Sequence, residues 1–475
     1  MQIISLQPAN NMKRLIIYFL ISLCIIQHIT VLPGCANIIP PSGGPIDSTA
    51  PLLVEANPPN LSKNFKGKQV TFTFDEFVQV QNLAENLLVS PTPIIPPQAT
   101  AKLHTVTLKL KDTLEENTTY TINFGNAIQD VHENNPVKNL TYVFSTGPTI
   151  DSLELKGHVV LAESGKIDST LIAMLHKKGD DSAVVKERPR YIVKLDGKGN
   201  FNFHNLPAGT FYLYAMKDEG GHRYQSPTQL FAFSDSAVVV GQTAPAITLY
   251  AYREKDVTAT VPPAQARANA QDKRLRFTTN LTNAKQDLMG NFVMIFETPI
   301  KSFDSSQLHF SSDSSFIPIT NYRVLLDSTK KKLQLEYPWK ENTIYHLIME
   351  KDFVVDTLGK KLLKTDTLTI STRRKADYGT VRIHIRNIDL TKHPVLLFFQ
   401  SDALVSSAPI AQGEFYQQLF LPGDYELRIL YDSNNNGKWD PGEFFGKHKQ
   451  PEIVFPIEKK ITIKPNWEND FERAL

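Results

Sequence analysis

The sequence predicts an all-β protein built from β-sandwich domains in series. Short segments that alternate apolar and polar residues, such as 69–74, are separated by turns rich in Pro, Asn and Gly. Residues that favour strands are abundant, among them 27 Phe and 16 Tyr. The 475 residues are too many for one hydrophobic core, so several domains are expected.

The beginning of the chain has the pattern of a secretory signal. Lys13 and Arg14 precede an apolar run, 15–26, which is shorter than the roughly 20 residues that span a bilayer. We expect residues 1–34 to be a signal peptide. Residues 35–50 are rich in Pro and Gly and are predicted to form a tether.

The residues Leu32-Pro33-Gly34-Cys35 resemble the bacterial lipoprotein signal. The resemblance implies that Cys35 carries a diacylglycerol and acyl (palmitate-type) lipid, becomes the mature N-terminus and anchors the protein to a membrane. Ala36 resembles the residue found in lipoproteins sent on to the outer membrane. A cell-envelope location follows, with the face of the outer membrane left open. The alternative is an unmodified thiol beside a conventional cleavage site.

Charge and cysteine content exclude several classes of function. Lys13 and Arg14 are two of the 51 Lys and Arg residues, so without the signal the numbers of cationic and acidic residues are equal, at 49 each. A net charge near zero argues against nucleic-acid binding, which depends on neutralising phosphates. Both cysteines, Cys24 and Cys35, lie in or at the signal, so no disulfide and no cysteine metal site are expected.

The next two segments are predicted to be β-sandwiches of different kinds. Residues 51–147 resemble the bacterial Ig-like domain family at Pro58-Pro59, 72–76, 116–120 and 144–146. In residues 151–252, an alternating strand, a Leu-Pro-Ala-Gly turn (206–209) and a second strand predict a β-hairpin. This second segment resembles the transthyretin or carboxypeptidase-regulatory class, which implies a spacer or binding domain without catalytic residues.

The pattern then repeats. Residues 253–273 are predicted to be an interdomain linker, after which 292–297 echoes 70–75 and 421–427 echoes 206–213. We therefore expect a second, divergent Ig-like domain at 274–374 and a second transthyretin-like sandwich at 378–475.

One stretch of the last domain predicts a Ca²⁺ site. Residues 432–443 fit the EF-hand calcium loop, with oxygen ligands at alternate positions and Gly437 at the sharp turn. The predicted ligands are Asp432, Asn434, Asn436, the carbonyl of Lys438, Asp440 and Glu443. With three carboxylates the site would be weak, on the order of 0.1 to 1 mM, and structural.

The surroundings of this loop differ from an EF-hand. A strand is predicted before it, and Pro441-Gly442 prevents a helix from starting inside it. The alternative is a polar hairpin turn held by Asn, Asp and Gly without a metal. The corresponding turn of the first copy, 218–222, lacks the ligand spacing, so no site is expected there.

No catalytic motif was found, and the protein is predicted not to be an enzyme. The favoured function is a lipid-anchored envelope protein that acts as a structural spacer or as a protein- or glycan-binding module. One alternative is a periplasm-facing accessory subunit of an envelope complex. Another is a carbohydrate-active enzyme, because the two carboxylates of a glycosidase need no fixed sequence spacing. An exposed aromatic groove, a large apolar patch or two facing carboxylates would distinguish these functions.

Overall fold

The computed structural model describes residues 15–22, 47–241, 246–255, 274–312 and 316–475. Residues 15–22 are helical, and no helix among the described residues is long and apolar enough to cross a membrane. From residue 47 onward the regular secondary structure of the described chain consists of strands and a few single helical turns, so the all-β prediction is confirmed. We divide it into module 1 (47–147), module 2 (151–255), module 3 (274–374) and module 4 (378–475).

Module 1 is a sandwich of two sheets, ordered β1-β2-β6-β5 and β4-β7-β9, with the pair β3-β8 at one end. The predicted strand 69–74 is β2, whose buried residues Val70, Phe72 and Phe74 face Ile122 of the other sheet. The elements are β1 (Leu53–Asn57), β2 (Gln69–Phe74), β3 (Val78–Val80), α2 (Leu83–Asn86), β4 (Leu88–Ser90), β5 (Gln98–Lys102), β6 (Thr105–Lys109), β7 (Thr119–Asn123), β8 (Ile128–Asp130) and β9 (Thr141–Ser145).

Module 2 is a sandwich with the sheets β13-β10-β17 and β12-β11-β14-β15, in which β16 also pairs with β14. Its elements are β10 (Leu153–Leu161), β11 (Leu171–His176), α3 (Ala183–Lys186), β12 (Tyr191–Lys194), β13 (Asn200–Leu206), β14 (Gly209–Lys217), β15 (Phe231–Phe233), β16 (Val238–Val240) and β17 (Ile247–Ala251).

The hairpin predicted around the Leu-Pro-Ala-Gly turn is wrong. β13 pairs with β10 and β14 pairs with β11, so the turn carries the chain from one sheet to the other. Phe203 of β13 and Phe211 of β14 enter the same core from opposite sides. Alternation predicts that each strand has one buried face, but it cannot tell cross-strand neighbours from residues facing each other across a sandwich.

Module 3 repeats the strand order of module 1 and adds the edge strands β19 and β23; its sheets are β18-β20-β25-β24 and β19-β28-β26-β22-β23, with the pair β21-β27. The predicted strand around 292–297 is β20, in the place that β2 has in module 1. The elements are β18 (Phe277–Thr279), β19 (Lys285–Gln286), β20 (Phe292–Phe296), β21 (Ile300–Phe303), η1 (Ser305–Gln307), β22 (Leu308–Ser312), β23 (Ile317–Pro318), β24 (Arg323–Leu326), β25 (Lys332–Glu336), β26 (Ile344–Met349), β27 (Val354–Asp356) and β28 (Asp366–Thr372).

Module 4 repeats the strand order of module 2, with the sheets β32-β29-β36 and β31-β30-β33-β34 and with β35 paired to β33. The short helix η2 (Lys375–Asp377) connects modules 3 and 4. The elements of module 4 are β29 (Gly379–Arg386), η3 (Leu390–Lys392), β30 (Pro394–Gln400), β31 (Ala403–Pro409), β32 (Glu414–Phe420), β33 (Gly423–Tyr431), β34 (Ile453–Pro456), β35 (Ile461–Ile463) and β36 (Glu468–Ala474).

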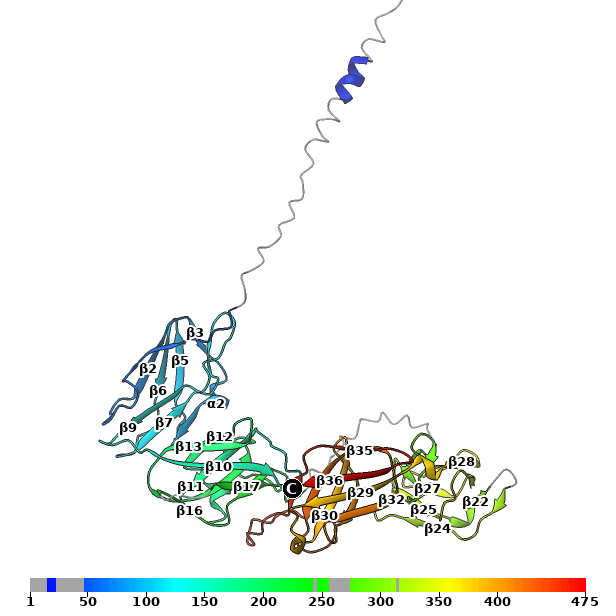
Figure 1. Cartoon of the computed structure of the whole chain (residues 1–475). Coiled ribbons are helices and arrows are strands. Elements are labelled where there is room, and N and C mark those ends of the chain that lie inside the picture. Colours follow the sequence, from blue (N-terminus) through cyan, green and yellow to red (C-terminus); the bar gives the residue numbers. More distant parts are fainter. Residues whose placement is uncertain (1–14, 23–46, 242–245, 256–273, 313–315) are drawn as a thin grey trace, which may run out of the picture.

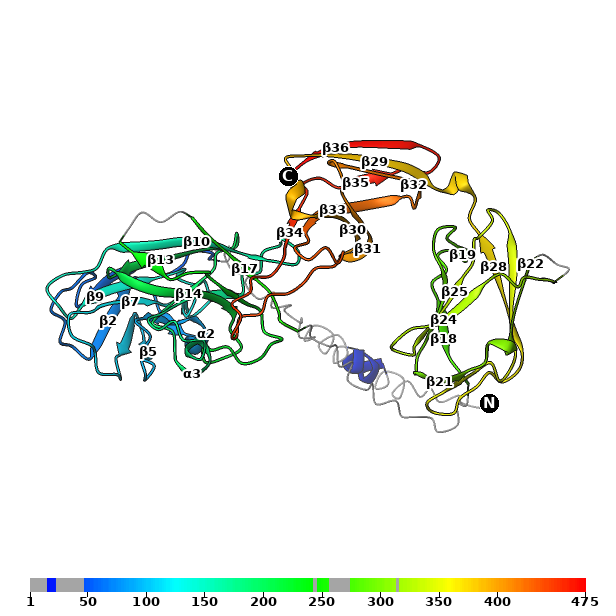
Figure 2. The same cartoon turned by 90° about the horizontal axis from the view of Figure 1, so that it is seen from below.

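The modules do not follow each other in space in chain order. Figures 1 and 2 show module 4 lying between module 2 and module 3. Module 1 packs on module 2, where the Arg190 guanidinium pairs with both carboxylate oxygens of Glu115 and Thr92 N–H donates to the Arg190 carbonyl at 2.9 Å. At the junction of modules 3 and 4, the Tyr378 hydroxyl donates to Asp287 at 2.8 Å and accepts from Leu288 N–H at 2.7 Å.

His176, at the end of β11, is buried and should make the stability of module 2 depend on pH. Its ring meets Tyr214 edge-on with centroids 5.6 Å apart, and burial lowers its pKa to about 4. Between pH 6.5 and 4 the unfolded chain binds a proton that the folded chain does not. The free energy of unfolding should therefore decrease as the pH is lowered from 6.5 to 4, by up to about 3 kcal/mol from this residue.

Urea unfolding of the wild-type chain and of His176→Leu, at pH 7 and at pH 4.5, measures this contribution. The variant should lose less stability than the wild type on acidification. An equal loss in both proteins would contradict the assignment.

Candidate functional site

The predicted calcium loop lies between β33 and β34 and is the first part of a long connection, 432–452. Asp432 is fully buried and organises the turn, because its carboxylate accepts the N–H groups of Asn436 at 3.2 Å and Gly437 at 2.6 Å. Gly437 has φ 74°, a left-handed conformation that glycine adopts without strain. The sequence pattern thus encodes a compact turn around one buried carboxylate.

The structure brings five of the six predicted ligand residues together, all but Glu443. The Asp440 carboxylate accepts from the side-chain amides of Asn434 and Asn436, the latter at 2.8 Å. The side-chain carbonyl of Asn434 in turn accepts Asn436 N–H at 3.0 Å. Lys438 belongs to the same turn, where its N–H donates to the Asn436 side chain at 2.7 Å.

Glu443 is engaged elsewhere. Its carboxylate pairs with Lys447 at 2.8 Å, and its backbone forms a bridge with Lys449. Pro441 and Gly442 intervene between Asp440 and Glu443, and the chain leaves the turn there. Within the described residues no group of three or more His, Cys, Asp and Glu side chains is placed to hold a metal ion.

A carboxylate that the sequence pattern does not mark closes the base of the loop. Glu452 is buried, accepts Ser433 N–H and Oγ–H at 2.7 Å each, and accepts Asp440 N–H at 3.0 Å. Its own N–H donates to the Asp440 carbonyl at 3.1 Å. The only signal in the sequence is an acidic residue at the start of an apolar strand, which by itself is too common to identify it.

The second half of the connection, the docking arm (443–450), leaves module 4 and packs on module 2. Phe444 is 2% exposed, and its ring lies 4.9 Å from Phe233, 5.1 Å from Phe231 and 5.8 Å from Tyr214. Phe445 meets Tyr224 at 5.1 Å. These module 2 side chains line the face of the β12-β11-β14-β15 sheet that is turned away from the core of module 2.

Polar contacts flank the docked ring. Asp181 of module 2 accepts Gly446 N–H at 3.0 Å and contacts His448 Nε2 at 2.5 Å. Gln450 donates to the Phe233 carbonyl at 3.0 Å and to Asp235 at 2.7 Å. These contacts orient the docking arm on the sheet.

Backbone and glycine contacts bring the two modules close together. Val454 N–H donates to the Ala162 carbonyl at 2.8 Å. A Cβ on Gly442 would lie 2.6 Å from the Tyr252 ring, and one on Gly165 would lie 2.3 Å from Pro456. Both approaches require glycine, because no side-chain carbon fits at these distances.

Trp439 connects the folded turn to the interface. Its indole N–H donates to the Glu452 carbonyl at 2.8 Å, and its ring packs against both the docked aromatic cluster and the module 4 cluster of Val395, Leu397, Leu430 and Val454. The turn 432–440 therefore determines where the docking arm begins.

The docked face keeps its tyrosines neutral. Burial raises the pKa of Tyr224 and Tyr252 well above the usual range, and the nearby Glu254 adds to the rise. The Glu254 carboxylate also accepts Phe444 N–H at 3.2 Å. The interface is thus an aromatic contact with a few charge-assisted hydrogen bonds, and it contains no arrangement typical of catalysis.

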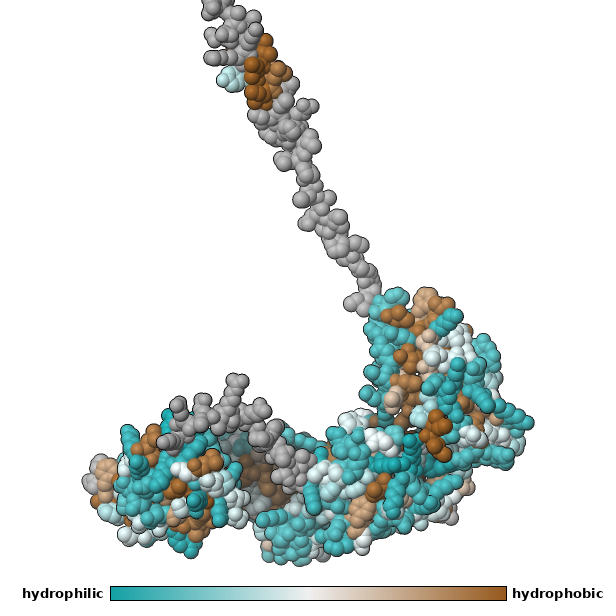
Figure 3. Space-filling view, turned by 180° about the vertical axis from the view of Figure 1, so that it is seen from behind, coloured by the Kyte–Doolittle hydropathy of each residue, from teal (hydrophilic) through white to brown (hydrophobic). Residues whose placement is uncertain are grey.

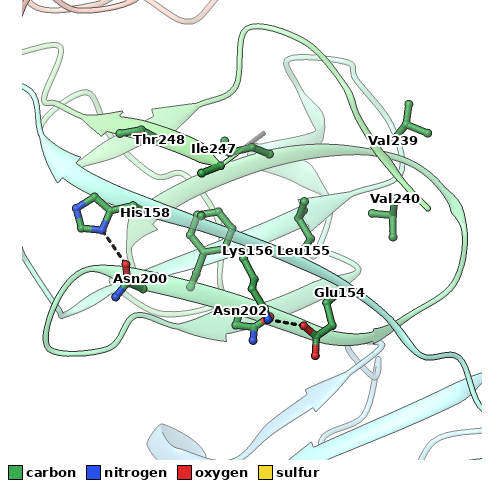
Figure 4. A pocket seen from close by; sticks show the side chains of 13 residues that line it. Glu154, Leu155, Lys156, His158, Asn200, Asn202, Val239, Val240, Ile247 and Thr248 are labelled. Carbon is green, nitrogen blue, oxygen red and sulfur yellow. Dashed lines mark hydrogen bonds and ion pairs between the residues drawn. The ribbon is translucent and has the colours of Figure 1, made fainter. Parts of the chain in front are cut away.

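One pocket on the outside of module 2 also lacks catalytic geometry. It has a volume of about 810 Å³ and lies over β10, β13, β16 and β17 (Figure 4). Glu154 is the one carboxylate among its lining residues, and its pairing with Lys156 and His204 lowers its pKa. A glycosidase needs two carboxylates, one of them protonated, so this pocket does not support that alternative.

The predicted lipidation residue, Cys35, lies outside the described residues, as does most of the predicted linker. Among the described residues from 47 onward, the exposed aromatic side chains are Phe77, Phe316, Tyr416 and Trp467, which are spread over three modules. This distribution gives no support for an aromatic glycan-binding groove.

A sequence profile of the bacterial Ig-like domain matches residues 47–146. Module 1 is a bacterial Ig-like domain. This match confirms the resemblance predicted for the first sandwich, and it covers that domain alone. An Ig-like domain within an all-β chain is typical of a structural or surface protein. No curated protein matches the chain significantly.

Solved structures resemble the chain only distantly. The major pilin subunit BcpA of Bacillus cereus is 10% identical, with 68% of this chain and 99% of the pilin covered and a TM-score of 0.16. The Bacillus anthracis TIE protein is 11% identical, with 92% and 75% covered and a TM-score of 0.17. Part of Escherichia coli alpha-2-macroglobulin is 14% identical, with 40% and 78% covered and a TM-score of 0.20.

Calcium binding by the turn stays a prediction, and the structure shows which variant tests it. Asp432→Ala would destabilise the turn with or without metal, because Asp432 holds two N–H groups. Asp440→Asn keeps the shape of the side chain but removes one of the charges that Ca²⁺ prefers. If the site exists, 5 mM CaCl₂ should raise the melting temperature of the wild-type chain by a few degrees, and this rise should be lost in Asp440→Asn.

Asp218→Asn in the corresponding turn of module 2 is the matched control and should keep the rise. No effect of Ca²⁺ on the wild-type protein would eliminate the site and leave the turn as a hydrogen-bonded one.

Proposed function

We propose that the protein is a non-enzymatic, lipid-anchored arm of the cell envelope that holds its modules in a fixed arrangement. The observation that carries this proposal is the docking of Phe444 into module 2. It joins two modules separated in the chain by the whole of module 3, so the second half of the chain is held against the first. A binding module needs only one exposed surface, whereas contacts at all three junctions suit a spacer of defined shape.

The junctions differ in chemistry, and together they limit bending. Modules 1 and 2 are joined by the Arg190–Glu115 pair and by β-strand contacts, and modules 3 and 4 by Tyr378. Modules 2 and 4 are joined by the aromatic contact, which lies among residues buried as deeply as those of a core. An apolar contact of this kind resists bending in every direction, since any opening exposes the aromatic surface to water.

Removing the Phe444 ring should release modules 3 and 4 from modules 1 and 2. Truncating a buried Phe costs roughly 3 to 5 kcal/mol, which is enough to populate an open arrangement. Cys24 is removed with the predicted signal, and Cys35→Ser removes the other native cysteine. Cysteines introduced at the exposed positions Lys186 and Lys459 are then unique sites for spin labels. Double electron–electron resonance should give a narrow distance distribution in the wild type and a broad one in Phe444→Ala.

Phe316→Ala is the matched control, because it removes the same ring from an exposed position in module 3. Its distance distribution should stay narrow. A narrow distribution in Phe444→Ala as well would show that the docked ring does not hold the arm together, and the spacer proposal would lose its support.

Lipid anchoring is tested separately from rigidity. In the native host, Cys35→Ser should abolish metabolic incorporation of an alkynyl palmitate analogue and release the protein from the membrane fraction, because one thioether-linked lipid group supplies the anchor. Cys24→Ser should leave both readouts unchanged. Retention of the label in Cys35→Ser would contradict lipidation at this residue.

A further inference from the structure

One end of module 1 exposes large apolar side chains that no other module covers. This apolar tip consists of Leu52, Phe77, Leu103 and Val131, which are 64%, 44%, 64% and 48% exposed. Single exposed apolar residues are ordinary on a protein surface, whereas several in contact mark an interaction site.

Backbone hydrogen bonds show that the members of the tip are neighbours. Val78 N–H donates to the Leu103 carbonyl at 3.0 Å, and Val131 N–H donates to the Phe77 carbonyl at 3.2 Å. Leu52 joins them through Asp75, because the Asp75 N–H donates to the Leu52 carbonyl at 3.2 Å. Brown side chains gather at this end of module 1 in Figure 3.

The tip lies where the chain enters module 1. The Asp47 carbonyl, the first of module 1, accepts from the Asn135 side chain at 3.0 Å, and the turn at Asn135 is held by Asp130, next to Val131. Figure 1 shows β3, which follows Phe77, at the same end. Residues 36–46 separate Cys35 from Asp47, and even fully extended they reach about 40 Å. With a lipid on Cys35, the tip therefore lies at the end of module 1 that the chain enters from the membrane.

We propose that the apolar tip rests on the lipid bilayer and thereby orients the whole arm. This inference rests on the proposed lipid anchor. A tethered module meets the bilayer at a high effective concentration, so a small apolar surface is enough to populate the contact. Leucine, phenylalanine and valine side chains enter the boundary between headgroups and acyl chains, where they lose contact with water.

The charges around the tip decide which lipid surface suits it. Asp75, Glu76 and Glu133 lie at the same end, so a strongly anionic bilayer would repel the tip and a zwitterionic one would not. Burial and the neighbouring carboxylates raise the pKa of Glu76, which lowers the cost of bringing it to a surface. A bilayer rich in zwitterionic lipid is thus the partner that fits.

The contact would determine how the rest of the protein stands. Figure 1 shows modules 1 and 2 stacked along one direction, with modules 4 and 3 extending sideways from module 2. With the tip on the bilayer, module 1 separates module 2 from the lipid, and modules 2, 4 and 3 lie at a fixed distance from the bilayer surface.

An environment-sensitive NBD label tests the contact. To separate this test from lipidation at Cys35, the chain from Ala36 onward carries an N-terminal decahistidine tag and is bound to phosphatidylcholine vesicles that contain a nickel-chelating lipid. The chain then has no native cysteine, so Leu103→Cys is labelled alone. NBD emission should rise at least twofold and shift to the blue on binding, and lipids brominated on the acyl chains should quench it.

Leu325→Cys, on the exposed edge strand β24 of module 3, is the matched control and should not respond. Adding Phe77→Ser and Val131→Ser to Leu103→Cys should reduce the response severalfold. Equal behaviour of labels 103 and 325, or a response that persists in the triple variant, would overturn the proposal, whatever the outcome for Cys35.

Discussion

The burial of the Phe444 ring against module 2 is the contact on which the arrangement of the modules depends. Module 4 follows module 3 in the chain, yet it packs on module 2. No covalent connection requires this, so the position of the second half of the molecule depends on non-covalent burial. An aromatic ring is suited to this role, because it removes a large apolar area from water and its edge-on contacts have a preferred geometry.

The polar turn that precedes Phe444 gives the docking arm its starting point. Asp432 and Glu452 are both buried, and each accepts hydrogen bonds from N–H groups of the loop itself. Buried carboxylates are tolerated when donors surround them, and here these donors are the backbone groups that a turn would otherwise leave unsatisfied. The same oxygen-rich residues that predict a cation site therefore also serve as a framework, and both roles favour the same compact turn.

The two related sandwiches use the same connection in different ways. In module 2 the turn after β14 stays on its own module, where Asp218 accepts Gly220 N–H and pairs with His222. In module 4 the corresponding connection is longer, and its aromatic residues reach the sheet face of module 2. A shared strand order thus leaves the loops free to form the interface, since sheet pairing fixes the framework and places few demands on the connections.

Local pattern by itself determined the strands, the Asp- and Asn-rich turn and the Ig-like character of module 1, because alternation and turn chemistry act between residues close in the chain. The strand 69–74 and the five predicted ligand residues gathered in the turn 432–440 belong to this class. Only the tertiary structure decided that β13 and β14 lie in different sheets, that Glu452 closes the turn and Glu443 does not, and that module 4 packs on module 2. Each of these depends on contacts between residues far apart in sequence. Because burial of any apolar surface that fits is favourable, the shape of the folded molecule decides which surfaces pack together.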